Sequence, residues 1–289
     1  MTCIHTPEGY IIYSNDFKFD NSPVLGDKPN YKRLEEIGKS GKLRVLIVEC
    51  LYATKDMKTP SEKVARELLQ DVLLGVENKG KAIYVTTFAS HIPRIRSIID
   101  CGKKMKRKVV ILGRSMGRYI RAAESVGLVK FSKEAHIVSY KGEMNKAFAE
   151  ISKNPGKYLI VGTGNQGEPN SILDKLLRGN IFPFSFKEGD HVIFSCKTIP
   201  HPLNLANRKV IEEKLKKSKV RIFTEIHVSG HAAREDLRDF ITMVKPDNII
   251  PSHGNQLMAK ALGELAEEIG YKIGENVHIL TDGNRTKLK

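Results

Sequence analysis

Two histidines, His231 and His253, have the clearest capacity for chemistry, because each stands in a short turn after an apolar segment. Imidazole titrates near neutral pH and ligates metal ions. We expect strands at 226–228 and 249–250, with a helix over 237–244 between them. This order puts both histidines at strand ends, where α/β proteins place their chemistry. Either histidine could instead be a turn residue that bonds the local backbone.

Two acids are placed in the same way. Asp16 follows an apolar run at 10–13, and Glu49 closes a second run at 43–48. Both runs are apolar on both faces, which is typical of strands in the interior of a sheet. We expect little chain ahead of the first run for it to pair with.

The rest of the chain alternates between short apolar runs and amphipathic segments. Thr59 is expected to cap a helix, because Pro60 follows it and Glu62 completes a capping box. Further strands are expected at 82–85, 109–112, 158–161 and 192–194, and helices at 92–101, 118–126, 170–177 and 207–217. This rhythm predicts an α/β fold, a parallel sheet with helices on both faces.

Three strand-to-helix turns carry small or polar residues, at Ser90-His91, at Arg114-Ser115 and at 162–169. Backbone N–H groups at such turns, with a helix N-terminus behind them, can hold a phosphate. Small residues also serve simply to make tight turns. The run at 162–169 is neither a dinucleotide fingerprint nor a P-loop.

The composition limits the classes of molecule that this protein is expected to bind. The 289 residues carry a formal net charge of +15, which favours a polyanion such as nucleic acid. No apolar run has the roughly 18 residues of a membrane span, so no membrane partner is expected, and the amino terminus has no signal-peptide pattern. Four scattered cysteines argue against a disulfide framework and indicate a reducing cytoplasm.

Taken together, the motifs resemble the β-CASP group of metallo-β-lactamase-fold nucleases, and most closely the archaeal ribonuclease J family. The resemblance covers residues 4–285 and rests on NDFKFD with Asp16, Glu49 closing a strand, TTFASHIPRI, GRSM, TGNQGEPNSIL, FSCKTIP, HVSGHAAREDL and IIPSHG. It implies a truncated metallo-β-lactamase fold of αββα type at 1–55 and 201–289. A β-CASP domain with a Rossmann-like parallel sheet is inserted at 56–200.

The resemblance also implies roles for single residues. Asp16 matches the aspartate that bridges two zinc ions, and His253 matches a histidine ligand of the second. His231 matches the histidine that assists the leaving group or binds the scissile phosphate, and Glu49 matches the acid that orients it. The implied RNA and phosphate contacts are Ser90, His91, Arg114, Ser115, Gly164, Gln166, Gly167, His227 and Ser229.

The sequence departs from the family pattern in its metal ligands. It has no HxHxDH run, and His5 lies too close to the strand at 10–13 to match the family's upstream ligand histidine. Asn15 replaces a usual glycine and Asn255 a usual glutamate. Asp16 and His253 then remain as direct ligands, fewer than the about three protein ligands of a catalytic zinc. We expect this polypeptide alone to be inactive and to bind zinc weakly, with the missing segment either supplied in trans by a separate chain or lost from the gene model.

Three functions follow from these observations. The first is a zinc-dependent RNA phosphodiester hydrolase that acts as a 5′-to-3′ exoribonuclease. Whether it also cleaves as an endonuclease, and whether it forms a homodimer, stays open. The second is a non-catalytic RNA-binding remnant of that family. The third is an unrelated α/β transferase, which would bind a nucleotide cofactor and ignore zinc.

Overall fold

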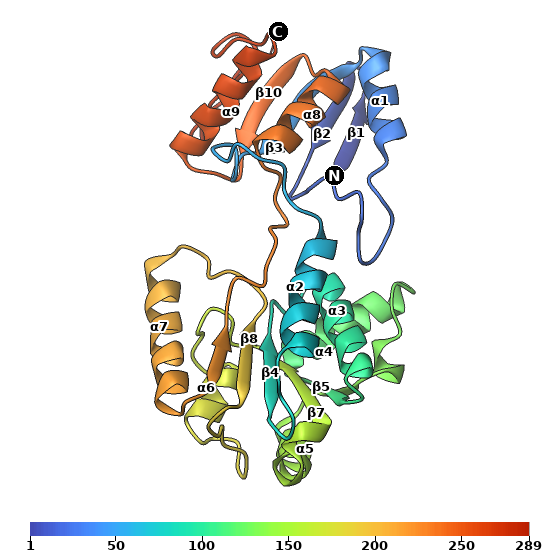
Figure 1. The fold of residues 1–289 in the computed structure, drawn as a ribbon. Helices are drawn as coiled ribbons and strands as arrows, with labels where there is room; N and C mark the ends of the chain where they lie inside the picture. Colours follow the sequence, from blue (N-terminus) through green and yellow to red (C-terminus); the bar gives the residue numbers. More distant parts are fainter. Residues whose placement is uncertain (289) are drawn as a thin grey trace. The chain divides into compact units, whose positions relative to one another are not determined.

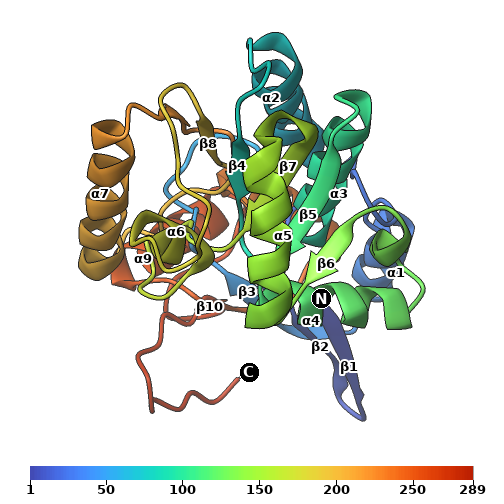
Figure 2. The same cartoon turned by 90° about the horizontal axis from the view of Figure 1, so that it is seen from below.

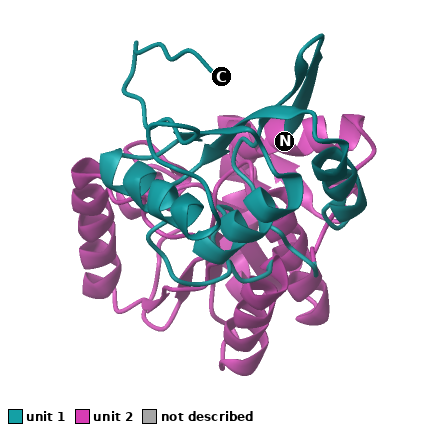
Figure 3. Cartoon of the chain, turned by 90° about the horizontal axis from the view of Figure 1, so that it is seen from above, with its two compact units in different colours: residues 1–22, 27–61, 229–289 teal, residues 23–26, 62–228 magenta. Residues whose placement is uncertain are grey.

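The computed structural model describes residues 1–288 and divides them into two compact units (Figure 3). Unit 1 contains residues 1–22, 27–61 and the chain from 229 onward, and unit 2 contains residues 23–26 and 62–228. The domain boundaries after residues 55 and 200 stay predictions. Residues 201–228 pack with unit 2 in this division.

Unit 1 is a four-stranded sheet with three helices (Figure 1). The strand order is β1 (Thr2–Thr6), β2 (Gly9–Tyr13), β3 (Leu43–Glu49) and β10 (Asn248–Ser252). β1 and β2 are antiparallel, whereas β2, β3 and β10 are parallel neighbours. The helices are α1 (Tyr31–Ser40), α8 (Arg234–Val244) and α9 (Gln256–Glu268), and one apolar core joins them to the sheet.

The strand at β2 lies inside the sheet as predicted, but the expectation that little precedes it is wrong. Residues 2–6 form β1 and pair with β2 in a hairpin. Because the side chains of β1 are exposed or half-buried, this strand needs no apolar run, and the sequence carried no such signal.

Unit 2 is a six-stranded sheet in which every neighbouring pair is parallel. Its order is β6 (His136–Val138), β5 (Lys108–Leu112), β7 (Tyr158–Gly162), β4 (Ile83–Thr86), β8 (His191–Phe194) and β9 (Arg221–Phe223). The strands alternate between two buried cores, so both faces are covered.

Three helices pack on each face of this sheet. One core includes side chains of α2 (Glu62–Gly75), α3 (Ile92–Lys104) and α4 (Arg114–Ser125), and the other those of α5 (Lys141–Lys153), α6 (Ile172–Leu177) and α7 (Pro202–Lys217). Figure 2 shows α2 and α3 on one side of the strands and α5 on the other. Short 3₁₀ turns occupy Phe131–Lys133 and Pro155–Lys157. The predicted parallel sheet with two helical layers is confirmed.

Two local predictions are wrong. Residues 226–228 form no strand, and the residue before them, Glu225, has a φ of +59°, which interrupts the extended chain after β9. The carbonyl of Ile226 accepts hydrogen bonds from buried side chains, Arg94 Nη1 and Ser195 Oγ, both at 3.1 Å. Thr59 is not a helix cap, since α2 begins at Glu62. Among residues 1–288, no helix combines the length and apolar character of a membrane span.

Candidate metal and catalytic site

Unit 1 brings together the four side chains that the sequence singled out for chemistry. Asp16 follows β2, Glu49 ends β3, and His253 follows β10, so three of them stand at the carboxyl ends of parallel strands. His231 reaches the same place from the loop ahead of α8. These segments are far apart in sequence, and the sheet is what places their side chains together.

Glu49 is the buried anchor of this cluster, with its side chain 1% exposed. One carboxylate oxygen, Oε1, accepts from Phe17 N at 2.8 Å and from Ala232 N at 3.3 Å. The other, Oε2, lies 2.5 Å from His231 Nδ1. The backbone bonds to Phe17 and Ala232 fix the two loops that carry Asp16 and His231, so one carboxylate positions both.

His231 is held in a defined orientation. Its Nδ1 faces Glu49, and the hydrogen bond to that carboxylate raises the pKa of His231 above its ordinary value, against the opposing effect of burial. A proton on Nδ1 leaves Nε2 as the ring atom for a ligand. The ring stacks on His253 with centroids 5.5 Å apart and planes inclined by 21°.

Asp16, His231 and His253 form a set of donors that suits a metal ion. One ligand atom from each lies within 4.8 Å of the other two, and Asp16 Oδ1 is 3.7 Å from His253 Nε2. Two imidazoles and a carboxylate are ordinary zinc ligands. The carboxylate of Glu49 behind His231 matches the pattern by which a second acid orients a ligand histidine. The residues present therefore fit a zinc ion, and His231 joins Asp16 and His253 as a candidate ligand.

Both turns that carry this site have left-handed backbone. Asn15 has a φ of +52° and His253 a φ of +51°. Asparagine is among the residues that adopt this conformation most readily after glycine, which explains Asn15 where the family usually has glycine. The other departure, Asn255, caps α9 by accepting from Met258 N at 3.0 Å. Neither change removes a candidate ligand.

Gly254 allows the turn of His253 to approach β3. A side chain at this position would place its Cβ 2.5 Å from Cys50 Sγ, directly after Glu49. The His253–Gly254 pair thus combines a donor with the small residue that lets the donor lie near the other strand end.

The loop of His231 has a further support that the sequence analysis missed. Thr59 Oγ1 donates to the carbonyl of His231 at 2.6 Å, and Thr59 N donates to Asp236 Oδ2 at 2.8 Å. Ser229 Oγ accepts from His231 N at 3.0 Å, so this predicted phosphate contact also holds the loop. A threonine before proline offered a helix-cap signal, which hid its long-range partner.

The remaining predicted RNA contacts lie in unit 2. Ser90, Arg114 and Ser115 are exposed, at the turns after β4 and β5, and His227 is half-buried near the end of the unit. Arg114 and Ser115 belong to the first turn of α4, whose N-cap Gly113 makes no side-chain cap bond. Ser90, Arg114 and Ser115 are therefore accessible to a ligand, and the roles of all four residues stay predictions.

Other residues that were predicted to contact RNA lie in turns where their structural role can be described. His91 caps α3, with Nδ1 accepting from Arg94 N at 3.1 Å. The buried amide of Gln166 donates to Lys197 O at 3.0 Å and accepts from Ile199 N at 2.7 Å. Gly164 and Gly167 are buried as well. Gln166 therefore fixes the loop that follows β8, and the predicted RNA contacts of all four residues stay predictions.

Arg94 is an important residue that sequence reasoning did not find. Its fully buried guanidinium makes a two-bond ion pair with Glu62, at 2.6 and 3.0 Å, and bonds the backbone and side chain of Ser195. Together with Ile226 it ties α2, α3, the end of β8 and the chain after β9. The partners are 32 to 132 residues away from Arg94, so no local pattern could reveal them.

Comparison with known proteins shows which family this chain resembles. A family model described as "Ribonuclease J, beta-CASP domain" matches residues 80–213, and one described as "Zn-dependent metallo-hydrolase RNA specificity domain" matches residues 218–280. Ribonuclease J of Methanocaldococcus jannaschii is 45% identical over 284 residues, which is 98% of this chain and 63% of that protein. Ribonuclease J of Pyrococcus abyssi is 42% identical over 288 residues, 100% of this chain and 63% of that protein.

The chain contains a ribonuclease J β-CASP domain. The predicted family and the predicted fold are therefore confirmed, and the unrelated transferase is excluded. Bacterial members are more distant, with ribonuclease J of Thermus thermophilus 34% identical over 283 residues. The chain spans 63% of the length of the two archaeal relatives.

Proposed function

We propose that this chain is a ribonuclease J-type, zinc-dependent RNA phosphodiester hydrolase that needs further metal ligands for full activity. The observation that carries the proposal is the meeting of Asp16, His231 and His253, with one ligand atom of each within 4.8 Å of the others. The buried carboxylate of Glu49 behind His231 supports it. A turn histidine used only for local bonding would not explain this convergence.

Each side chain has a proposed task. Asp16 and His253 would hold the metal. His231, oriented by Glu49, has one ring nitrogen, Nε2, for two alternative tasks. It would be a third metal donor while the site lacks other ligands, and in a complete site it would instead face the phosphate and carry the proton for the leaving oxygen. Zinc held there would supply a hydroxide at neutral pH and would neutralise charge on the phosphate. The raised pKa of His231, caused by its bond to Glu49, favours the protonated ring that the second task needs.

The proposed limit on activity follows from the number of donors. A catalytic zinc commonly has three protein ligands and an open position. The cluster of Asp16, His231 and His253 could serve one ion, but two ions need more donors. We therefore propose that a segment with an HxHxDH motif completes the site.

The test is reconstitution. The chain, a peptide that carries HxHxDH, and Zn²⁺ or Mn²⁺ are mixed with end-labelled RNA, after association of peptide and chain has been shown by gel filtration. Cleavage that appears only in the complete mixture, and disappears with Asp16→Asn, supports the proposal. An associated mixture without cleavage would contradict it. Release of mononucleotides from the 5′ end would indicate exonuclease action, and internal fragments endonuclease action.

A second candidate function is RNA binding without catalysis, which the net charge of +15 favours. We propose RNA as the partner in either case, through Ser229 and His227 and through the exposed turns at Ser90 and Arg114. Filter binding at several salt concentrations tests this, because phosphate contacts make affinity fall steeply with salt. Binding in a catalytically silent reconstituted mixture would favour the second function. Four free cysteines accord with the proposed cytoplasmic location.

A further inference from the structure

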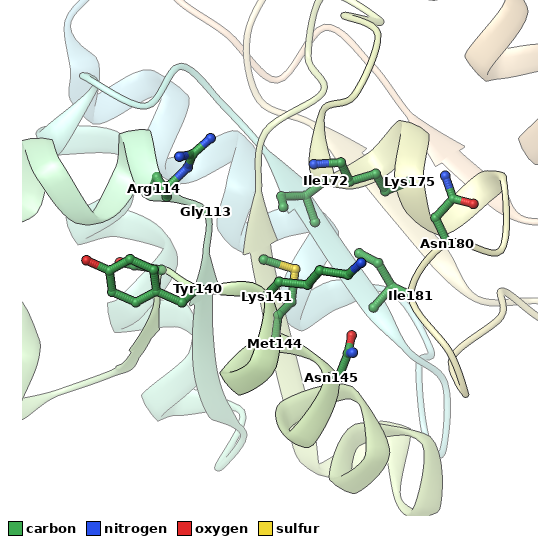
Figure 4. Close-up of a pocket in the computed structure, with 11 residues that line it drawn as sticks. Gly113, Arg114, Tyr140, Lys141, Met144, Asn145, Ile172, Lys175, Asn180 and Ile181 are labelled. Carbon is green, nitrogen blue, oxygen red and sulfur yellow. The ribbon is translucent and has the colours of Figure 1, made fainter.

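A pocket of about 570 Å³ lies within unit 2, at the carboxyl ends of β5 and β6. Gly113 and Arg114 come from the turn after β5, Ser139 and Tyr140 from the turn after β6, and Ile172 from the start of α6. The rest of the lining is Lys141, Met144, Asn145, Lys175, Asn180 and Ile181. Figure 4 shows Lys141 reaching across toward Ile181, with Lys175 on the opposite side and Asn145 below.

The rim of this pocket is positively charged and has no acid to balance it. Arg114, Lys141 and Lys175 all line it, and the lining contains no aspartate or glutamate. Within residues 1–288, none of these three cations forms an ion pair with a carboxylate. Uncompensated cations around a concave surface attract an anion.

Two helices add to this preference. α4, with 12 residues, and α5, with 13, begin at the pocket, and their N-cap residues Gly113 and Tyr140 make no side-chain cap bond. Their first-turn N–H groups and the positive end of the helix dipole are therefore available to an anion. The amides of Asn145 and Asn180 complete a polar rim.

The floor of the pocket is apolar, and a phosphate group has no apolar surface that would cover it. Met144, Ile172 and Ile181 are 8%, 5% and 3% exposed and line the same space as the cations. Small-molecule pockets of about 300–1,000 Å³ combine such an apolar surface with a few polar groups that orient the ligand. A ligand with a flat apolar face and an attached phosphate fits both parts.

We propose that this pocket binds a nucleoside monophosphate unit. The phosphate lies at Lys141, Lys175 and the N-termini of α4 and α5, and the base rests on Met144 and Ile181. The unit is either a free nucleotide or one nucleotide of an RNA strand. The proposal goes beyond the proposed function, because the Asp16, Glu49, His231 and His253 cluster takes no part in it. Arg114 is the one residue common to this site and the predicted RNA contacts.

Calorimetric titration of the metal-free full chain with AMP tests the site. We expect saturable binding, about tenfold weaker in Lys141→Ala and in Lys175→Ala, since a hydrogen bond to a charged group has about this effect. Lys146→Ala is the matched control, because Lys146 is an exposed lysine of the same helix that does not line the pocket. Asn145→Trp, which fills the pocket without changing charge, should abolish binding.

Circular dichroism and thermal melting of each variant separate lost binding from lost folding. Adenosine and inorganic phosphate should each bind more weakly than AMP, since each lacks one half of the ligand. Displacement of AMP by a 5′-hydroxyl oligoadenylate would assign the pocket to RNA, and AMP binding without displacement to free nucleotides. Absence of AMP binding, or equal AMP affinity in wild type, Lys141→Ala and Asn145→Trp, would overturn the proposal and leave the hydrolase proposal standing.

Discussion

Replacement of Glu49 by glutamine tests how much of unit 1 depends on one carboxylate. The change keeps size and keeps an oxygen that can accept from Phe17 N and Ala232 N, which lie 2.8 and 3.3 Å from Oε1. It removes the charged contact to His231 Nδ1 at 2.5 Å. A hydrogen bond to a charged group contributes about 1.5–3 kcal/mol, so we expect Glu49→Gln to lower the free energy of unfolding by about 2 kcal/mol. Glu49→Ala should lower it further, because it leaves both buried N–H groups without a partner.

The loss should depend on pH in a defined direction. Glu49 raises the pKa of His231 in the folded chain. A histidine whose pKa is raised by folding stabilises the fold fully at pH values below its pKa in the unfolded chain, which is near 6.5. This contribution is lost as pH rises through the pKa of the folded chain. The deficit of Glu49→Gln should therefore be larger at about pH 6 than at about pH 9.

Urea unfolding in the presence of a chelator measures both effects, and NMR titration of the His231 ring should show its pKa falling in Glu49→Gln. Glu8→Gln is the control, since Glu8 is an exposed acid of the same unit, in the turn between β1 and β2. If Glu49→Gln and Glu8→Gln unfold at the same urea concentration at both pH values, the anchoring role of Glu49 is refuted.

Three further predictions concern unit 2. Burial lowers the pKa of His191 to about 4, so this residue should lower wild-type stability by about 3 kcal/mol as pH drops from about 6.5 to 4. The variant His191→Leu should lose less stability over the same pH range. Melting curves of both proteins at the two pH values test this, and equal losses would contradict it. Arg94→Lys cannot keep the two-bond pair with Glu62 and should cost about 3–5 kcal/mol, seen by urea unfolding; unchanged stability would contradict a structural role. Gly167→Ala would place Cβ 2.4 Å from Asn207 C at a φ of +73°, and should lower stability by about 2 kcal/mol or more; an unchanged melting temperature would contradict this.

The site was largely predictable because strand ends carry a local signal. Asp16, Glu49 and His253 each follow an apolar run, and parallel strands bring their carboxyl ends to one edge. His231 was found although its predicted strand does not exist, because glycine and serine beside it still indicated a turn. Residues 226–228 have the alternating burial of a strand. The carbonyl of Ile226, however, accepts hydrogen bonds from Arg94 and Ser195 and does not pair with a neighbouring strand.

The parts that sequence could not supply depend on distant partners. Gln166 stands in a turn typical of phosphate binding, yet its amide bonds the backbone at 197 and 199. Thr59 has the pattern of a helix cap and instead bonds Asp236 and His231. By contrast, α9 was missed even though Leu262, Leu265 and Ala266 follow a helical period and are fully buried; its signal was available in the sequence.

The most direct test of the account is zinc binding by the chain itself. Titration against a chromophoric chelator should show one Zn²⁺ per chain, held more weakly than structural zinc sites, whose binding free energies are about 10–16 kcal/mol. Asp16→Asn and His253→Gln should each remove it. Asp27→Asn and His5→Gln, which alter exposed residues of the same unit outside the cluster, should not. Absence of zinc binding, or binding unchanged by Asp16→Asn and His253→Gln, would contradict the central claim that these side chains form a metal site.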